Sequence, residues 1–191
     1  MSRLCLGAKT GRLYTTALHG RKMRNLEAKF RLKNLEAARG HALAIGFEER
    51  GILIQRDTFF SVPNGKLKLR QQTGCASLIH YRRSDQSELQ LSDYAIATIS
   101  DPDALRAMLA AALGVLAEVR KQRTLMMRRN IRLHLDRVER LGDFGEIEAV
   151  LPDDSPPDGY QKEVSAILTA LGIVELDLIG VSYFELLKPP I

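Results

Sequence analysis

Residues 25–33 read NLEAKFRLK, nine residues in which the odd positions are polar or charged and the even positions are apolar. Strict alternation of this length indicates a β-strand with two unlike faces, because successive side chains of a strand point to opposite sides. The polar face carries Glu27 and Lys29, which have charges of opposite sign. The fold therefore depends on whether this face meets water or lines a polar interior.

The same alternation recurs in five further segments, and eight strands are predicted in all. They are expected at 23–33, 51–62, 66–72, 76–83, 88–99, 115–127, 130–138 and 144–151. Three helices are expected: from the cap Asn34 to Gly46, from Asp101-Pro102 to Gly114, and at about 160–171. Short turns between most strands favour antiparallel pairing. We therefore predict an α+β fold that is mainly β: an eight-stranded antiparallel β-barrel, or tunnel, with the helices packed outside.

The composition is that of an ordinary globular protein, since 45% of the 191 residues are hydrophobic and 27% are charged. A chain of this length can form one domain with its own core. Cys5 and Cys75 are far apart and lack metal-ligand spacing, which argues against a disulfide framework and against a zinc site. No apolar run reaches the ~18 residues that a membrane helix needs. We expect a cytoplasmic protein with no membrane partner.

The basic side chains are unevenly distributed along the chain. The whole sequence has 28 Lys and Arg against 23 Asp and Glu, but residues 1–22 contain five bases and no acid. Residues 23–191 are therefore neutral overall and lack the field that draws nucleic acids to a surface, so no nucleic-acid partner is predicted. The basic extension 1–22 is expected to be a disordered tail, an organelle transit peptide or the product of a misassigned start codon, and residues 23–191 a single domain.

The charged faces of the predicted strands are mostly sorted by sign. The rows are Lys66, Lys68 and Arg70; His80 and Arg82; Lys121 and Arg123; Arg132, His134 and Asp136; and Glu146 and Glu148. Taken singly, each row is explained by a solvated sheet face. Like charges two residues apart, roughly 6.5–7 Å along a strand, repel unless a counter-ion lies between them. A polyphosphate against the bases and a divalent metal against the glutamates would supply these counter-ions, which favours a wet, charged lumen.

Five motifs in order resemble those of the CYTH superfamily, the triphosphate tunnel metalloenzymes. They are NLEAK at 25–29, KLKLR at 66–70, RKQR at 120–123, IRLHLD at 131–136 and GDFGEIE at 142–148. The likeness covers nearly all of the chain from Met23 onward. The stretches DTFFSVPNGKLKLR and GDFGEIE are most similar to the class IV adenylate cyclase branch, which grades into thiamine triphosphatase and inorganic tripolyphosphatase.

The resemblance implies roles for individual residues. The bases that would grip a triphosphate are Lys66, Lys68, Arg70, Arg82, Lys121, Arg123 and Arg132. The ligands of Mg²⁺ or Mn²⁺ would be Glu27, Glu146 and Glu148, and Glu27 and Lys29 would be the catalytic residues. His134 and Asp136 have the parity of Arg132, and both a lumen and a surface position stay open for them. The family motif commonly reads ExExK, and Asn25 replaces its first Glu, so one metal or two metals remain possible.

The resemblance also implies an enzyme whose substrate is a small-molecule triphosphate: ATP, thiamine triphosphate or tripolyphosphate. Likeness to the cyclase branch makes cyclisation of ATP to cyclic AMP and pyrophosphate the first expectation. Hydrolysis of thiamine triphosphate or tripolyphosphate is the alternative, and a non-catalytic module that binds polyphosphate or nucleotide is the second alternative. The sequence has no P-loop and no GxGxxG motif after a strand. A homodimer through an outer sheet face is compatible with the sequence.

Overall fold

The computed structural model describes residues 23–83, 89–152 and 156–187, so the predicted extension 1–22 lies outside the described residues. Its strands are β1 (Met23–Arg31), β2 (Glu48–Phe60), β3 (Lys66–Gln72), β4 (Cys75–Arg83), β5 (Gln90–Ile99), β6 (Val115–Arg128), β7 (Ile131–Val138) and β8 (Gly142–Leu151). Each predicted strand is present. The bounds differ by up to three residues, the largest shift being the earlier start of β2 at Glu48.

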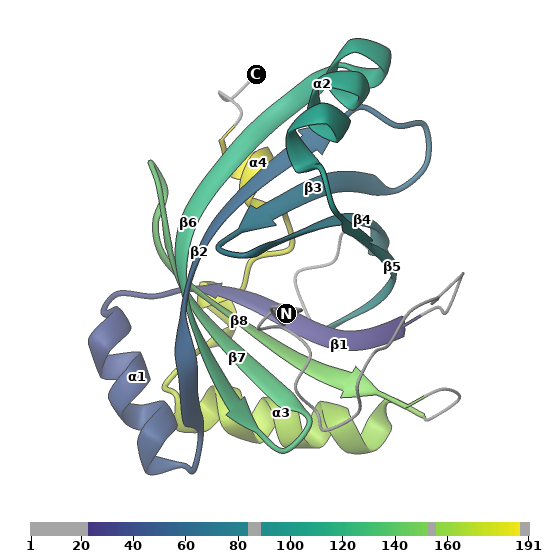
Figure 1. Cartoon of the computed structure of the whole chain (residues 1–191). Coiled ribbons are helices and arrows are strands. Elements are labelled where there is room, and N and C mark those ends of the chain that lie inside the picture. The colour runs from purple at the N-terminus through teal and green to yellow at the C-terminus, as the bar shows by residue number, and fades with distance from the viewer. Residues whose placement is uncertain (1–22, 84–88, 153–155, 188–191) are drawn as a thin grey trace.

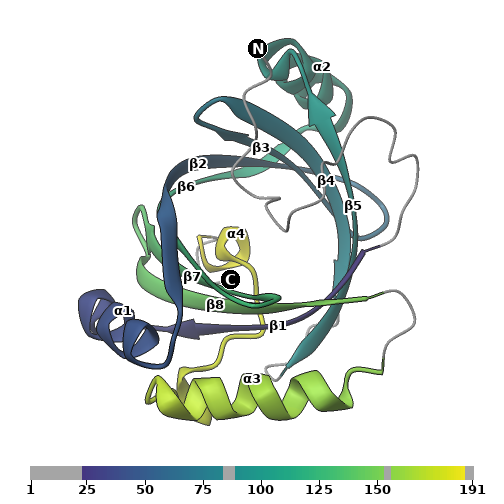
Figure 2. The same cartoon turned by 60° about the horizontal axis from the view of Figure 1, so that its bottom comes forward.

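The strands close into a barrel in the order β1-β5-β4-β3-β2-β6-β7-β8, with β8 pairing back onto β1. All neighbouring pairs are antiparallel. Figure 2 shows the ring that they form, with α1 and α3 outside it. This arrangement confirms the predicted fold class. Because alternate side chains of each strand point inward, the barrel has a lumen whose lining can be taken from the strand register.

The helices on one side of the barrel cover its main apolar core. Helices α1 (Leu35–Ala44) and α3 (Asp158–Ala170) lie outside β1, β7 and β8 (Figure 1). Asn34 caps α1 as predicted, since its side-chain oxygen accepts a hydrogen bond of 3.0 Å from the backbone N–H of Ala37. Helix α2 (Pro102–Leu113) lies at the other end of the molecule and contributes no buried residue.

Strand β1 has the two faces that its sequence predicts. Leu26, Ala28 and Phe30 are buried in the core beneath α1 and α3. Asn25, Glu27 and Lys29 have the opposite parity and point into the lumen, where they are also almost fully buried. The charged face of β1 therefore lines the interior of the barrel.

The C-terminal segment, for which the sequence predicts no element after about residue 171, closes one end of the barrel. It contains the 3₁₀ helix η1 (Glu175–Asp177) and the short helix α4 (Tyr183–Leu186), which projects within the ring of strands in Figure 2. The backbone N–H of Ile179 donates to the carbonyl of Lys29 at 2.8 Å. Tyr183 and Phe184 pack in a second apolar cluster with strand residues Phe59 and Phe144, among others. One end of the lumen is thus filled by apolar side chains.

Two further findings concern the expectations from composition. Within the part of the chain that the structure describes, none of the helices has both the length and the apolar character to cross a membrane. Cys75 at the start of β4 is disulfide-bonded, so the argument against a disulfide was wrong for this cysteine.

Candidate active site

The lumen gathers nearly all of the predicted site residues. The strand register gives inward positions to Glu27 and Lys29 on β1, Lys66, Lys68 and Arg70 on β3, Lys121 and Arg123 on β6, Arg132 on β7, and Glu146 and Glu148 on β8. Residues that lie directly opposite each other on neighbouring strands share a face. The inward face can therefore be followed from strand to strand around the barrel. Five strands from distant parts of the sequence therefore bring charged side chains into one interior.

Strand β4 is the exception, because the prediction that its residue Arg82 lines the lumen was wrong. Lys68 pairs with Ile79, and Lys66 pairs with Tyr81, so Ile79 and Tyr81 point into the lumen. Arg82 has the opposite parity and is exposed on the outer face of the barrel. The cause is the two-residue turn at Gly74, which pairs Gln72 with Cys75 and so fixes which β4 residues share the face of the β3 lysines. The structure does not bring Arg82 to the other bases.

Two buried aspartates, Asp57 and Asp136, neutralise the rows of bases, a contribution that the sequence interpretation missed. Asp57 on β2 accepts hydrogen bonds from Arg70 at 2.7 and 2.6 Å and lies 3.7 Å from Lys68 Nζ. The carboxylate of Asp136 on β7 accepts two hydrogen bonds of 2.6 Å from Arg123 and lies 3.3 Å from Lys121 Nζ. The sequence interpretation assigned the counter-ions of these rows to a polyphosphate, whereas in the structure aspartates of neighbouring strands also supply them.

Glu146 lies at the centre of the charged network. One of its oxygens accepts a hydrogen bond of 2.9 Å from Lys29, and the other accepts one of 2.7 Å from Arg123. Burial raises the pKa of the Glu146 carboxyl, but Lys29, His134 and Arg123 outweigh burial and hold the pKa well below its usual range. Glu146 is therefore ionised at neutral pH.

His134, Glu146 and Glu148 form a cluster with the chemistry of a metal site. Their potential ligand atoms lie within 4.8 Å of one another. His134 Nδ1 is buried without a hydrogen-bond partner and lies 3.7 Å from a carboxylate oxygen of each glutamate. Burial and the charge of Arg123 lower the pKa of His134, which favours the neutral imidazole that can bind a metal. Glu27 lies directly across from Glu148 in the register but is not a member of the cluster.

Two lysines of the lumen have strongly lowered pKa values. Burial and the neighbouring charge of Arg70 lower the pKa of Lys68 to about 8. Burial and the charge of Arg123 lower the pKa of Lys121 to about 7. Each ammonium group is desolvated and lies beside a guanidinium, and one aspartate does not compensate for both effects. An entering anion would favour the charged form of both lysines.

Helix α4 contacts the bases at the closed end of the lumen. The ring of Tyr183 lies 4.3 Å from Lys29 Nζ and 4.9 Å from Lys121 Nζ, and its hydroxyl donates to Asp136 at 2.9 Å. Lys66 Nζ lies 2.9 Å from the carboxylate of Glu185. The sequence offered no signal for these contacts, because a four-residue helix has no periodic pattern that predicts where it packs.

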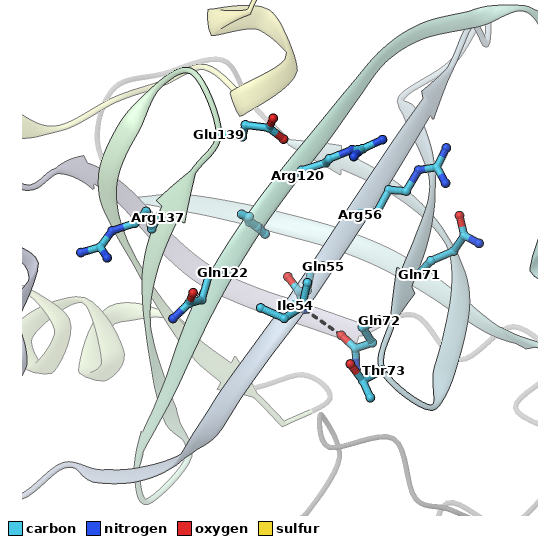
Figure 3. Close-up of a pocket in the computed structure, with 11 residues that line it drawn as sticks. Ile54, Gln55, Arg56, Gln71, Gln72, Thr73, Arg120, Gln122, Arg137 and Glu139 are labelled. Atoms are coloured by element: carbon cyan, nitrogen blue, oxygen red, sulfur yellow. Dashed lines mark hydrogen bonds between the residues drawn. The ribbon is translucent and has the colours of Figure 1, made fainter.

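A pocket of about 630 Å³ is lined mainly by residues of β2, β3, β6 and β7 (Figure 3). It contains none of the clustered residues His134, Glu146 and Glu148. Of the predicted site residues only Lys121 lines it. The lining arginines Arg56 and Arg120 both pair with Glu118, at 2.6 and 2.8 Å. The hydrogen bond drawn in Figure 3 joins Gln55 to Gln72. Because this pocket contains only one of the predicted bases and none of the clustered residues, we place the candidate site in the lumen.

Comparison with known proteins agrees with this geometry. No curated protein matches the chain. Among solved structures, a Pyrococcus horikoshii OT3 protein is 27% identical, with a TM-score of 0.76 over 86% of this chain and 99% of that chain. A proposed adenylate cyclase from Vibrio parahaemolyticus is 22% identical, with a TM-score of 0.71 over 85% of this chain and 97% of that one.

A third structure is that of a proposed adenylyl cyclase from Hippeastrum, described as having a dominant triphosphatase activity. It is 15% identical, with a TM-score of 0.62 over 86% of this chain and 94% of that one. The last two likenesses concern the fold. The family model of the CYTH domain matches residues 23–183. With its closed eight-stranded tunnel and its inward acids and bases, the chain belongs to the CYTH domain family.

Proposed function

We propose that this protein is a metal-dependent enzyme that acts on a small-molecule triphosphate held in the lumen of the barrel. The observation that carries the proposal is the meeting, in one buried interior, of two Lys-x-Arg rows with the cluster of His134, Glu146 and Glu148. A protein that only binds an anion has no use for two neighbouring glutamates grouped with a buried histidine nitrogen that lacks a hydrogen-bond partner. A triphosphate-processing site needs both the bases and this cluster.

The cluster fits a divalent metal. Two carboxylates and a neutral imidazole are suitable donors, and the orphaned Nδ1 of His134 gains a partner when a metal binds. Mg²⁺ prefers oxygen ligands, so the histidine favours Mn²⁺. His134, Glu146 and Glu148 would hold the ion, with Glu27 close to Glu148 on the neighbouring strand. When bound, the metal would neutralise charge that develops on phosphate oxygens.

The bases of the chain do the remaining work in this proposal. Lys68, Arg70, Lys121 and Arg123 bind the phosphate chain and fix which phosphorus meets the nucleophile. Lys29, held by Glu146, supplies a positive charge beside the metal cluster. Tyr183 does not act as a base, because burial and Asp136 raise its pKa well above the ordinary value. Lys66 and Arg132 would contact phosphates toward the two ends of the lumen.

Cyclisation of ATP to cyclic AMP and pyrophosphate is our first candidate reaction, by likeness of DTFFSVPNGKLKLR and GDFGEIE to the cyclase branch. Hydrolysis of thiamine triphosphate or tripolyphosphate is the second candidate. It is favoured by the lumen itself, in which the charged side chains suit phosphate groups rather than a base. We also propose that the protein acts in the cytoplasm, although a disulfide bond such as that of Cys75 is rare in that compartment.

The test is to incubate the purified protein with ATP, thiamine triphosphate or tripolyphosphate, each with Mg²⁺ or Mn²⁺, and to identify the products by chromatography. Cyclic AMP with pyrophosphate identifies a cyclase, and orthophosphate identifies a triphosphatase. A chelator should abolish either reaction. Tight binding of these compounds without any product would instead identify a binding module and refute the enzyme.

A further inference from the structure

Two aspartates inside the barrel have no part in the function proposed above. Asp57 and Asp136 are 3% and 0% exposed. Burial alone would raise the pKa of the Asp57 carboxyl, but the charges of Arg70 and Lys68 hold that pKa far below the usual range. Asp136 has equivalent contacts, with Arg123 and Lys121. Both aspartates are therefore fully ionised in a desolvated interior.

The two aspartates belong to two copies of one local arrangement. Asp57 lies directly across from Arg70 in the β2–β3 register, and Asp136 lies directly across from Arg123 in the β6–β7 register. In each copy a lysine precedes the arginine by two residues and approaches the same carboxylate, at 3.7 Å for Lys68 and 3.3 Å for Lys121. Since β2 and β6 are neighbours, the copies lie side by side in the barrel wall.

The contacts of each aspartate define the orientation of one guanidinium group. In both copies the carboxylate accepts from Nε and Nη2 of the arginine, at distances between 2.6 and 2.7 Å. Two parallel hydrogen bonds fix the plane of the guanidinium as well as its position. Nη1 takes no part in either pair and lies at the edge of the guanidinium group that points away from the aspartate. A long side chain that would otherwise sample many rotamers is thereby held in one.

Stability does not explain these pairs well. A buried ion pair loses the hydration of both charges, and well-packed apolar side chains of similar size often stabilise a protein as much or more. Two such pairs at equivalent positions indicate a need for oriented charge. Glu146 also accepts a hydrogen bond from Arg123 Nη2, but through one oxygen only, and its other oxygen accepts from Lys29, so it does not fix the guanidinium plane as the aspartates do.

We propose that Asp57 and Asp136 are positioning residues, each of which orients one Lys-x-Arg pair so that the two pairs grip neighbouring phosphates of one polyphosphate chain. The inference rests on the proposed function. It assigns to the aspartates a favourable effect on the binding of an anion, although they carry the same sign of charge as the ligand.

This opposition of signs makes the test decisive. Asp57→Asn and Asp136→Asn each remove one negative charge from the lumen, so simple attraction predicts tighter binding of tripolyphosphate. Positioning predicts weaker binding, by about tenfold or more for each variant, because the arginine loses its fixed orientation. The measurement is calorimetric titration of the full-length protein with tripolyphosphate in the presence of a chelator. Circular dichroism and thermal unfolding verify that each variant is folded.

Asp143→Asn is the matched control. Asp143 is partly exposed on the outer face and pairs with Arg137 at 3.3 Å, so the same change of charge should leave binding unchanged. Asp57→Glu and Asp136→Glu keep the charge but displace the carboxylate, and they should also weaken binding. Equal or tighter binding by the asparagine variants would overturn the inference, as would variants that no longer fold. Failure of the unaltered protein to bind tripolyphosphate, ATP or thiamine triphosphate would instead refute the proposed function.

Discussion

The two sides of the barrel differ in what they present to the lumen. Strands β1, β2, β3, β6, β7 and β8 contribute the carboxylates and bases, which pair with one another at distances of 2.6 to 3.7 Å. Apart from Arg83, the last residue of β4, whose register partner is Ser92, the described inward residues of β4 and β5 are uncharged, and they include Ile79, Tyr81, Ser92 and Tyr94. We call these the charged wall and the neutral wall.

The outer faces of the two walls also differ: part of that of the charged wall is buried and apolar, and that of the neutral wall carries charged side chains. Behind β1, β7 and β8 of the charged wall lies the main apolar core, covered by α1 and α3. The outer face of the neutral wall is largely exposed and carries Arg82 and Asp93. The difference teaches that charge in a strand sequence does not by itself identify the lumen. The charges that a tunnel uses are those that neighbouring strands can neutralise.

The largest effect is expected from Glu148→Gln in the charged wall. It removes one of the two carboxylates of the cluster that we propose holds the metal. Turnover of the triphosphate substrate should fall by about 10²- to 10³-fold, since a group that stabilises transition-state charge is lost. Mn²⁺ binding, measured by electron paramagnetic resonance without substrate, should weaken in parallel. Glu118→Gln, which changes a carboxylate on the outer face, should preserve both properties.

The next prediction compares the two walls by removing one charge from each. Lys68→Met keeps the length of the side chain but removes a charge from the charged wall, and affinity for tripolyphosphate should fall by about 10- to 100-fold, since a hydrogen bond to a charged group contributes roughly 1.5–3 kcal/mol. Arg82→Met removes a charge from the outer face behind the neutral wall. Its affinity should change by less than about twofold, because exposed charges contribute little. Similar losses for both variants would contradict the division into two walls.

The charged wall was largely predictable from the sequence because its strands alternate without interruption. NLEAKFRLK buries Leu26, Ala28 and Phe30 in the main core, and KLKLR buries Leu69, so period two decides where the side chains point. Family resemblance then connected these faces to a triphosphate. The neutral wall was predicted with the wrong parity, since the charges of β4 were taken to point inward. The tight turn between Gln72 and Cys75 was visible in the sequence and would have corrected this.

Other parts of the site depend on contacts that a single sequence does not contain. That Asp57 faces Arg70 follows from the register of two strands, and that Asp136 faces Arg123 follows from the register of two others. His134 was visible as a lumen candidate, but its place beside Glu146 needs the pairing of β7 with β8. Tyr183 enters the barrel through a C-terminal segment with no periodic pattern.

Close packing behind the charged wall gives the third prediction. A Cβ atom on Gly145 would lie 2.0 Å from the ring of Phe30 in the main core. Gly145→Ala should therefore destabilise the protein by about 1–3 kcal/mol, the usual cost of overpacking, and lower the unfolding temperature by several degrees. Gly159→Ala in the first turn of α3 meets no atom within 4 Å and should not lower it. An unchanged unfolding temperature for Gly145→Ala would contradict the packing described behind β8.

The fourth prediction concerns pH and uses the two lysines of the charged wall. With pKa values of about 8 for Lys68 and about 7 for Lys121, both lose charge in the empty lumen as the pH rises. An anion binds the charged forms, so protons must be taken up on binding, and affinity for ATP should fall by about tenfold between pH 7 and pH 8. Lys121→Arg does not titrate in this range and should show a shallower decline. Because both proteins meet the same ATP, its own protonation cancels in the comparison.

The smallest effect is expected in the neutral wall, where the organic part of a substrate would lie if the phosphates occupy the charged wall. The hydroxyl of Tyr94 donates to Asn25 at 3.3 Å, on the lumen side of the β1–β5 pair. Tyr94→Phe removes about 1 kcal/mol of hydrogen bonding and keeps the ring. Affinity for ATP should fall by a few-fold at most, while affinity for tripolyphosphate, which has no organic part, should stay the same. A larger loss of affinity for tripolyphosphate than for ATP would mean that phosphates contact both walls. Both sides of the lumen would then bind phosphate, which contradicts the division into two walls.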